Sequence, residues 1–149
     1  MKIRILLIPL ICVLAAVLSV QAQDKGAKST ESETELETKM EEINAAYRKL
    51  NRQVKDSEKN ADSLEQVSII KQNATAALKL EPKMKAEISA ADQAKFVADY
   101  QAGMKDFVAN VAKLEAALKA DKNEDAENMM KTLKQGQKDG HKQFKKKKK

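Results

Sequence analysis

The sequence has few of the residues that carry catalytic chemistry or disulfide bonds: one cysteine, one histidine, two prolines and no tryptophan in 149 residues. Cys12 lies within an apolar segment at the start of the chain, and we expect that segment to be removed. The remaining chain then has no disulfide, no cysteine metal site and no thiol nucleophile. No nucleophile–base set, carboxylate cluster or phosphate-binding loop is recognisable either. The sequence therefore predicts a protein that is not an enzyme.

The first 22 residues have the three parts of a secretory signal peptide. Lys2 and Arg4 supply positive charge, residues 5–18 form an apolar run, and Ala22 ends a short segment of the kind that a signal peptidase reads. The run is shorter than the roughly 20 residues that cross a bilayer, which argues against a retained anchor. We expect cleavage before Gln23 and export to the periplasm.

Between its two ends, the chain carries nearly equal numbers of basic and acidic residues. Without Lys2, Arg4 and the lysine tail Lys145–Lys149, 21 of the 28 basic residues remain beside 22 acidic ones. The positive excess therefore belongs to the ends, and we predict no nucleic-acid binding. We expect the lysine tail to be a solvated end of the chain. The alternatives are contact with an anionic membrane surface and attraction of an acidic partner.

Helix formers dominate the rest of the chain, which contains a single proline, and four segments repeat apolar residues at intervals of three and four. The first segment opens with a capping box that begins at Thr34. The second starts near Asp62 and ends before Pro82, because proline disfavours a helix in the residue before it. Ser89 and Asn123 are in position to cap the third and fourth helices, with an earlier turn at residues 83–87 as the alternative start of the third.

Short connections between these segments favour antiparallel packing of neighbours. The sequence therefore predicts an all-α fold, an up-down-up-down antiparallel four-helix bundle over residues 34–146. Residues 23–33 are polar and are expected to form a disordered leader. Residues 145–149 form the basic tail.

One end of the predicted bundle differs from the other. Met40 near the start of the first helix and His141 near the end of the fourth both lie on apolar stripes, so we expect both to point into the bundle at the same end. Three of the five aromatic residues gather in that region, and two fall near mid-bundle. Methionine on a stripe is usually core filler, and histidine near a helix C-terminus usually complements the helix dipole. Together, however, a thioether and an imidazole are the ligand pair of a six-coordinate haem. The aromatic residues of this end are Phe96, Tyr100 and Phe144, and those of mid-bundle are Tyr47 and Phe107.

These residues resemble the cytochrome b562 family over roughly residues 34–146, most closely in Glu35–Asn44, Ala117–Lys119 and Leu133–Phe144. The resemblance implies an up-down four-helix bundle with Met40 and His141 as axial ligands of one b-type haem and Phe107 packed on the haem. The sequence lacks Cys-x-x-Cys-His, in agreement with non-covalent haem binding.

The sequence departs from the family type at three positions. Gln137 and Gly140 stand where the type has an arginine and a tyrosine, and Gly103 stands where it has a second haem-contacting phenylalanine. Tyr100 can partly replace that phenylalanine. The candidate cofactor-binding residues are thus Met40, Tyr100, Phe107, His141 and Phe144, of which Met40 and His141 would bind the metal.

Two functions agree with this interpretation. The first is a periplasmic electron-transfer protein, expected to be a monomer that docks weakly on redox partner proteins of the cell envelope. The second is a haem-free helical bundle with a binding or structural role in the envelope. Met84 is the rival axial ligand, since it lies in the connection after Pro82, which we expect to be non-helical and to cover the pocket edge. In the first case the lysine tail could also neutralise haem propionates.

Overall fold

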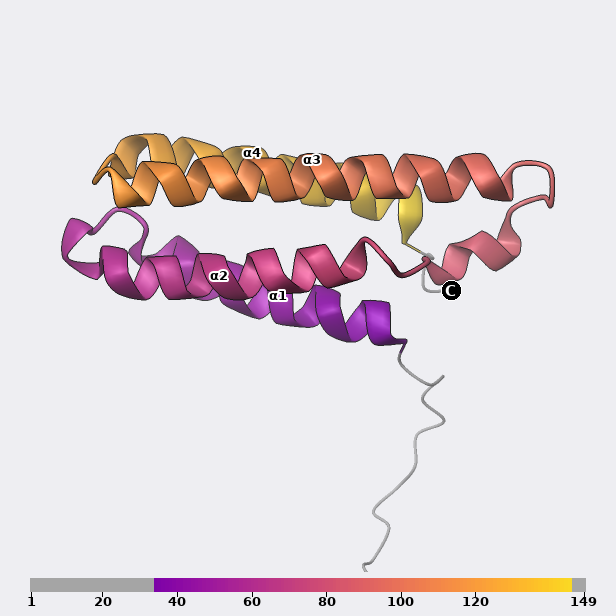
Figure 1. Ribbon diagram of the computed structural model, residues 1–149, viewed down its shortest axis with the longest axis horizontal. Helices are drawn as coiled ribbons and strands as arrows, with labels where there is room; N and C mark the ends of the chain where they lie inside the picture. Colours follow the sequence, from indigo (N-terminus) through magenta and orange to yellow (C-terminus); the bar gives the residue numbers. More distant parts are fainter. Residues whose placement is uncertain (1–33, 146–149) are drawn as a thin grey trace, which may run out of the picture. The chain divides into compact units, whose positions relative to one another are not determined.

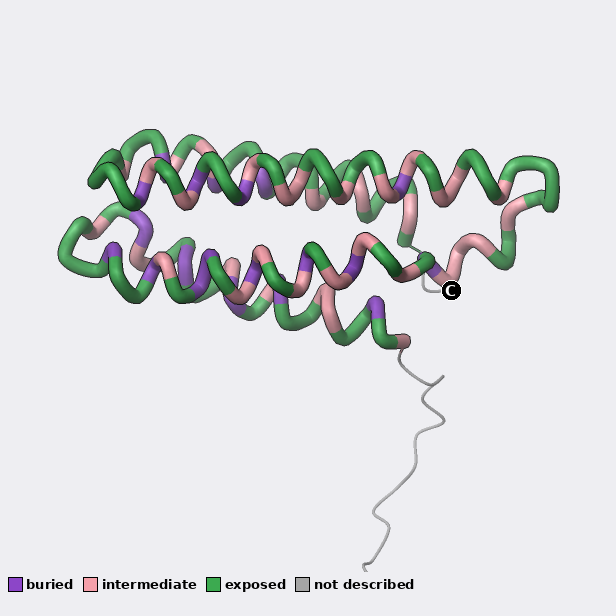
Figure 2. The backbone as a smooth tube through the Cα atoms, in the orientation of Figure 1, coloured by how far each residue is buried: buried purple, intermediate pink, exposed green. Residues whose placement is uncertain are grey.

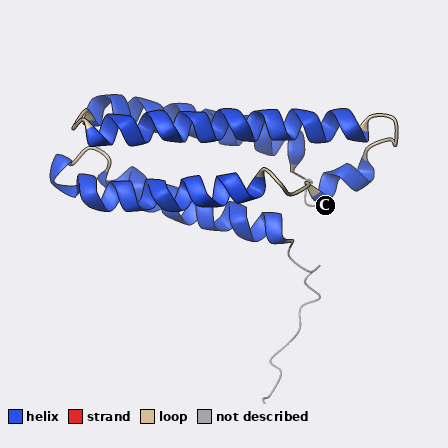
Figure 3. Ribbon diagram, in the orientation of Figure 1, coloured by secondary structure: helices blue, strands red, loops and turns tan. Residues whose placement is uncertain are grey.

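The computed structural model describes residues 34–145. The predicted signal peptide, the predicted leader and all of the lysine tail beyond its first residue lie outside the described residues. The described chain consists of four α-helices and two 3-10 helices and contains no strand (Figures 1 and 3). In chain order these are α1 (Glu35–Gln53), η1 (Ser57–Lys59), α2 (Asn60–Ala77), η2 (Lys83–Glu87), α3 (Gln93–Lys119) and α4 (Asn123–Phe144). The predicted all-α class and the four helices are confirmed.

Successive helices run in alternating directions (Figure 1). Helix α1 packs on α2, α2 on α3, and α3 on α4. The start of α1, the connection between α2 and α3, and the end of α4 therefore share one end of the bundle, which we call the Met40 end. The other end holds the α1–α2 and α3–α4 connections.

The apolar stripes meet in two clusters. In Figure 2 the buried positions recur along the faces that the helices turn toward one another. A smaller cluster at the Met40 end consists of Leu36, Ala77 and Tyr100. Burial of each large aliphatic side chain stabilises the fold by about 1.5–3 kcal/mol, so the main core supplies most of the hydrophobic stabilisation. That core contains Ile43, Ala46, Leu50, Val54, Val67, Ile70, Ala74, Val111, Leu114, Leu118, Ala126, Met130 and Leu133.

The start of α1 has the predicted capping box. The Thr34 hydroxyl accepts a hydrogen bond from the Glu37 amide at 3.3 Å, and the Glu37 carboxylate accepts one from the Thr34 amide at 2.8 Å. Lys83 of η2 also lies 2.8 Å from the Glu37 carboxylate. The Lys83 hydrogen bond, followed by that of the Thr34 amide, lowers the pKa of Glu37 to about 2. One carboxylate therefore caps α1 and ties η2 to it.

The predicted cap of α4 is wrong, because Asn123 is the first residue of the helix rather than its cap. Its side-chain amide donates to the Val54 carbonyl and to the Asn60 Oδ1, both at 2.8 Å. These bonds join the two connections at the far end of the bundle. The buried Val54 carbonyl requires a hydrogen-bond donor, and the Asn123 side chain supplies it. This contact between connections is why Asn123 does not cap its own helix.

The connection between α2 and α3 also differs from the prediction. Helix α2 ends at Ala77, before Pro82 as expected, but residues 83–87 form the separate 3-10 helix η2, which is neither a non-helical segment nor a first turn of α3. Helix α3 begins at Gln93. The Ser89 hydroxyl donates to the Asp92 carboxylate at 2.6 Å and so does not cap an amide of the helix.

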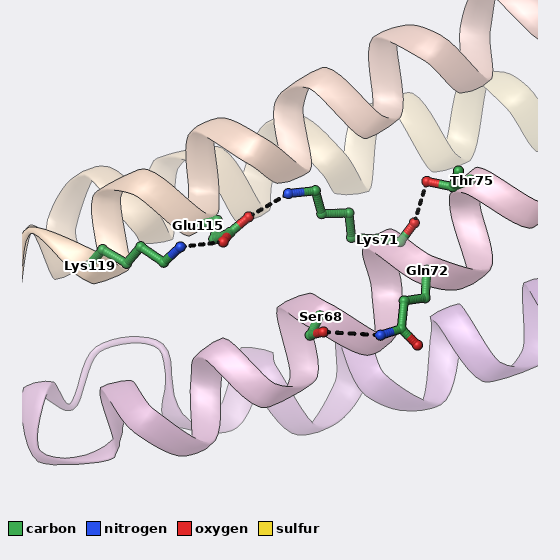
Figure 4. A network of polar contacts seen from close by, with 6 residues as sticks. All are labelled: Ser68, Lys71, Gln72, Thr75, Glu115 and Lys119. Atoms are coloured by element: carbon green, nitrogen blue, oxygen red, sulfur yellow. Dashed lines mark hydrogen bonds and ion pairs between the residues drawn. The ribbon is translucent and has the colours of Figure 1, made fainter.

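An ion-pair network on the outer surface joins α2 to α3 (Figure 4). The Glu115 carboxylate receives Lys71 of α2 at 2.8 Å and Lys119 of its own helix at 2.5 Å. Hydrogen bonds from Lys119 and then Lys71 lower the pKa of Glu115 to about 2. Exposed pairs of this kind contribute roughly 0–1 kcal/mol each, so the network fixes the register of the helices more than it stabilises them.

Candidate functional site

Met40 lies in the second turn of α1, at the boundary between the two hydrophobic clusters. It is half-buried, and its side chain packs against both clusters. The side chain therefore belongs to the core at the Met40 end, as the sequence predicts. A thioether in this position is both an adaptable filler of the core and a soft ligand available to a metal in the bundle interior.

Three aromatic rings meet at the Met40 end, as expected. The Phe144 ring lies 5.4 Å from that of Phe96 and 5.5 Å from that of Tyr100, at interplanar angles of 68° and 80°. Both contacts are edge-to-face, the favoured geometry for aromatic pairs. The Tyr100 hydroxyl donates to the Ala77 carbonyl at 3.0 Å, and burial raises the pKa of Tyr100 to about 12. Phe144 thus closes the end of α4 onto the start of α3.

The other two aromatic residues lie deeper, as predicted. Phe107 is half-buried and packs against the main core. The Tyr47 hydroxyl donates to the Met130 carbonyl at 2.9 Å, which joins α1 to α4, and burial raises the pKa of Tyr47. Of the five candidate residues, the structure brings Met40, Tyr100 and Phe144 into one cluster and leaves Phe107 one layer further in.

His141 does not point into the core as expected, since its side chain is exposed. The inward stripe of α4 runs through Leu133, Gln137, Gly140 and Phe144 at intervals of three and four, and this places His141 beside the stripe. Partial burial of the ring, followed by the positive charge of Lys145, lowers the pKa of His141. The neutral imidazole, which is the form that binds a metal, therefore predominates at neutral pH.

Two glycines leave space at this end. A Cβ atom at Gly103 would meet only the Phe144 ring, with Cε2 at 4.0 Å, and one at Gly140 would meet nothing within 4 Å. Phe144 of α4 therefore borders the position where the family type carries a phenylalanine on α3. The residues of this end fit haem in their chemistry: a thioether, a neutral imidazole, aromatic rings and space beside the histidine.

Met104 is a residue that sequence reasoning missed as a rival ligand. It is half-buried on α3 and packs against both clusters, as Met40 does. The sequence does contain a signal for Met104, because it lies on the apolar stripe of α3 between Tyr100 and Phe107. Met84, the rival chosen from the sequence, is half-buried in η2.

Residues 34–145 lack two features that would indicate other kinds of site. In this part of the chain, no three His, Cys, Asp or Glu side chains lie where they could together hold a metal ion. None of the described helices combines the length and apolar character that crossing a membrane requires.

Comparison with protein families identifies the chain. Residues 35–145 match the family model of cytochrome b562, so the chain belongs to this family. Members of the family are helical proteins that bind b-type haem and transfer electrons without catalysing a reaction. Searches of curated proteins and of solved structures each found no significant match.

Proposed function

We propose that this member of the cytochrome b562 family is a periplasmic electron carrier that binds one b-type haem non-covalently, with Met40 and His141 as the axial ligands. The observation that carries the proposal is the family match over residues 35–145. It is supported by the packing of Met40 against the core and by the shared end of the bundle at which α1, with Met40, begins and α4, with His141, ends (Figure 1). The predicted signal peptide supports export.

The chain's own residues would each have a distinct role. Haem supplies a one-electron iron couple. Met40 would offer its thioether from the core side and His141 its neutral imidazole from the flank of α4. If Met40 and His141 both bind the iron, no iron position would remain for oxygen or a substrate, which would favour outer-sphere electron transfer. Methionine–histidine ligation also raises the reduction potential relative to most other ligand sets.

The aromatic cluster would shield the cofactor from water. Tyr100 is held by its bond to the Ala77 carbonyl and presents its ring to Phe144. Phe107 packs one layer further in. Apolar walls around a haem favour its reduced, less charged state and therefore reinforce a high potential.

The proposal is tested by adding haem to the mature protein and recording reduced-minus-oxidised absorbance spectra. We expect sharp low-spin bands that saturate at one haem per chain. His141→Ala should abolish the low-spin bands, whereas Lys142→Ala, the matched control at the exposed neighbouring position, should leave them unchanged. Absence of haem bands from the unmodified protein would contradict the proposal.

A haem-free envelope protein is the second candidate, and one observation favours it. The rings of Phe96, Tyr100 and Phe144 already pack on one another at the Met40 end. A bundle that needs no cofactor should unfold cooperatively, with a midpoint that haem does not change. Under the first proposal, ligand binding to the native state should raise the midpoint as haem concentration increases.

A further inference from the structure

The outer flank of α4 carries a continuous stripe of lysines toward the Met40 end. Lys134, Lys138, Lys142 and Lys145 are all exposed. At 3.6 residues per turn, Lys134, Lys138 and Lys142 fall within roughly 80° of arc around the helix axis, and Lys145 follows directly after the end of α4. His141 lies at the edge of this arc, between the lysines and the inward stripe. Lys145 is followed in the sequence by four more lysines.

Helix α1 continues the positive surface across a groove. The groove has a volume of about 380 Å³, and its lining includes three basic side chains and no carboxylate. Arg48 and Arg52 of α1 face Lys134 of α4 across it. We call these three residues, with Lys138, Lys142 and Lys145, the basic face. The groove is lined by Asn44, Tyr47, Arg48, Asn51, Arg52, Lys134 and Gln137.

The charges of the basic face are not neutralised within the described residues. Several lysines elsewhere in the bundle have carboxylate partners, as in the pairs of Lys71 with Glu115 and of Lys95 with Asp99. No residue of the basic face has an ion-pair partner in residues 34–145. Glu41, two turns before Arg48, is an exposed carboxylate at nearly the same angular position on α1, and the positive charges of the basic face outnumber it.

We propose that the basic face is a docking surface for a protein partner that presents a carboxylate-rich patch. This inference rests on the proposed function, because docking beside His141 would bring the partner close to the iron. Arginines in a groove suit carboxylates, since their planar guanidinium groups bind carboxylate oxygens in pairs. Attraction between opposite patches speeds association and orients the partner.

A membrane surface fits the basic face less well than a protein does. A helix that lies in a membrane interface inserts an apolar face, but the apolar stripe of α4 is packed inside the bundle at Ala126, Met130 and Leu133. The arginines, moreover, line a hollow that a protruding side chain can enter and a flat lipid surface cannot.

The test measures binding of poly-L-glutamate to the haem-free mature protein at low salt. The variant R48E/K134E/K138E reverses three charges of the basic face. The matched control K105E/K113E/K122E makes the same change in net charge at exposed positions on α3 and the following turn. Both variants are checked by circular dichroism for a helical, cooperative fold. We expect the first variant to weaken binding by at least about tenfold and the control by less than about threefold.

Two further measurements complete the test. Amide chemical shifts of the unmodified protein should change on poly-L-glutamate addition in Asn44–Arg52 and Lys134–Lys145. Equal loss of affinity in both variants, or shifts spread evenly over the four helices, would mean that net charge alone drives binding and would overturn the inference. So would binding to phosphatidylglycerol–phosphatidylcholine vesicles without binding to poly-L-glutamate. Because no haem is present, failure here is distinguishable from failure of haem binding.

Discussion

Truncation of Phe144 tests whether the last turn of α4 is packed as the structure indicates. Replacing a fully buried phenylalanine with alanine lowers the free energy of unfolding by about 3–5 kcal/mol. Phe144 is half-buried, which brings the expected cost to about 2 kcal/mol. That cost already includes the two edge-to-face contacts, with Phe96 and Tyr100, which are worth roughly 0.5–1.5 kcal/mol each. We therefore expect Phe144→Ala to lower the free energy of unfolding by about 2 kcal/mol.

Urea unfolding of the haem-free protein followed by circular dichroism measures this change. The midpoint should fall while the dependence on urea concentration stays constant, as in a two-state transition with an unchanged exposed area. Gln143→Ala is the control, because Gln143 is exposed and surface changes usually stay within about 0.5 kcal/mol. Equal stability of the two variants would refute the packing of Phe144 on α3.

Three other perturbations follow from the same structure. Gly136→Ala and Gly140→Ala should each stabilise the haem-free protein by up to about 1 kcal/mol, because alanine favours the helix and neither new Cβ meets an atom within 4 Å. A lowered melting temperature in either variant would contradict this. Tyr100→Phe should cost about 1 kcal/mol in urea unfolding, because it removes the buried donor to a carbonyl of α2; an unchanged midpoint would show that the bond contributes nothing. The pKa of Glu37 is about 2 in the folded state against an ordinary 4.5, so its stabilising effect should be present above pH 4.5 and be lost as the pH falls toward 2. Glu37→Gln should remove that part of the acid dependence, and a pH profile unchanged by the substitution would argue against the Lys83 and Thr34 contacts.

Features determined by neighbouring residues could be predicted from the sequence. The capping box at Thr34 depends on residues three apart, and the end of α2 before Pro82 depends on the local geometry of proline. The gathering of Phe96, Tyr100 and Phe144 required only helix periodicity and the antiparallel order of the helices. Each of these expectations agrees with the structure.

Features determined by the register between helices could not be predicted in this way. Asn123 has the residue type of a cap, but the Val54 carbonyl on another connection takes its amide. His141 is one residue away from position 140, which lies on the inward stripe of α4. That shift of one residue places the histidine side chain on the flank of the helix instead of in the core. Gly140 occupies the inward position instead, and periodicity cannot assign a direction to a residue without a side chain.

The same limit applies to the choice of methionine. Met40 and Met104 pack against the same two clusters, and the pattern of the sequence does not rank them. The family resemblance chooses Met40. The spacing of the lysines on α4 can be read from the sequence. That Arg48 and Arg52 lie across a groove from these lysines could not be predicted, because it depends on how α1 packs beside α4.

The central claim is that Met40 and His141 hold the haem, and electron paramagnetic resonance of the oxidised, haem-loaded protein tests it most directly. We compare the unmodified protein with Met40→Leu, Met104→Leu and Met84→Leu, which change volume little. We expect a low-spin ferric signal in the unmodified protein, in Met104→Leu and in Met84→Leu, and its loss in Met40→Leu alone. A low-spin signal that survives Met40→Leu and disappears in either of the other variants would show that Met40 is not the ligand.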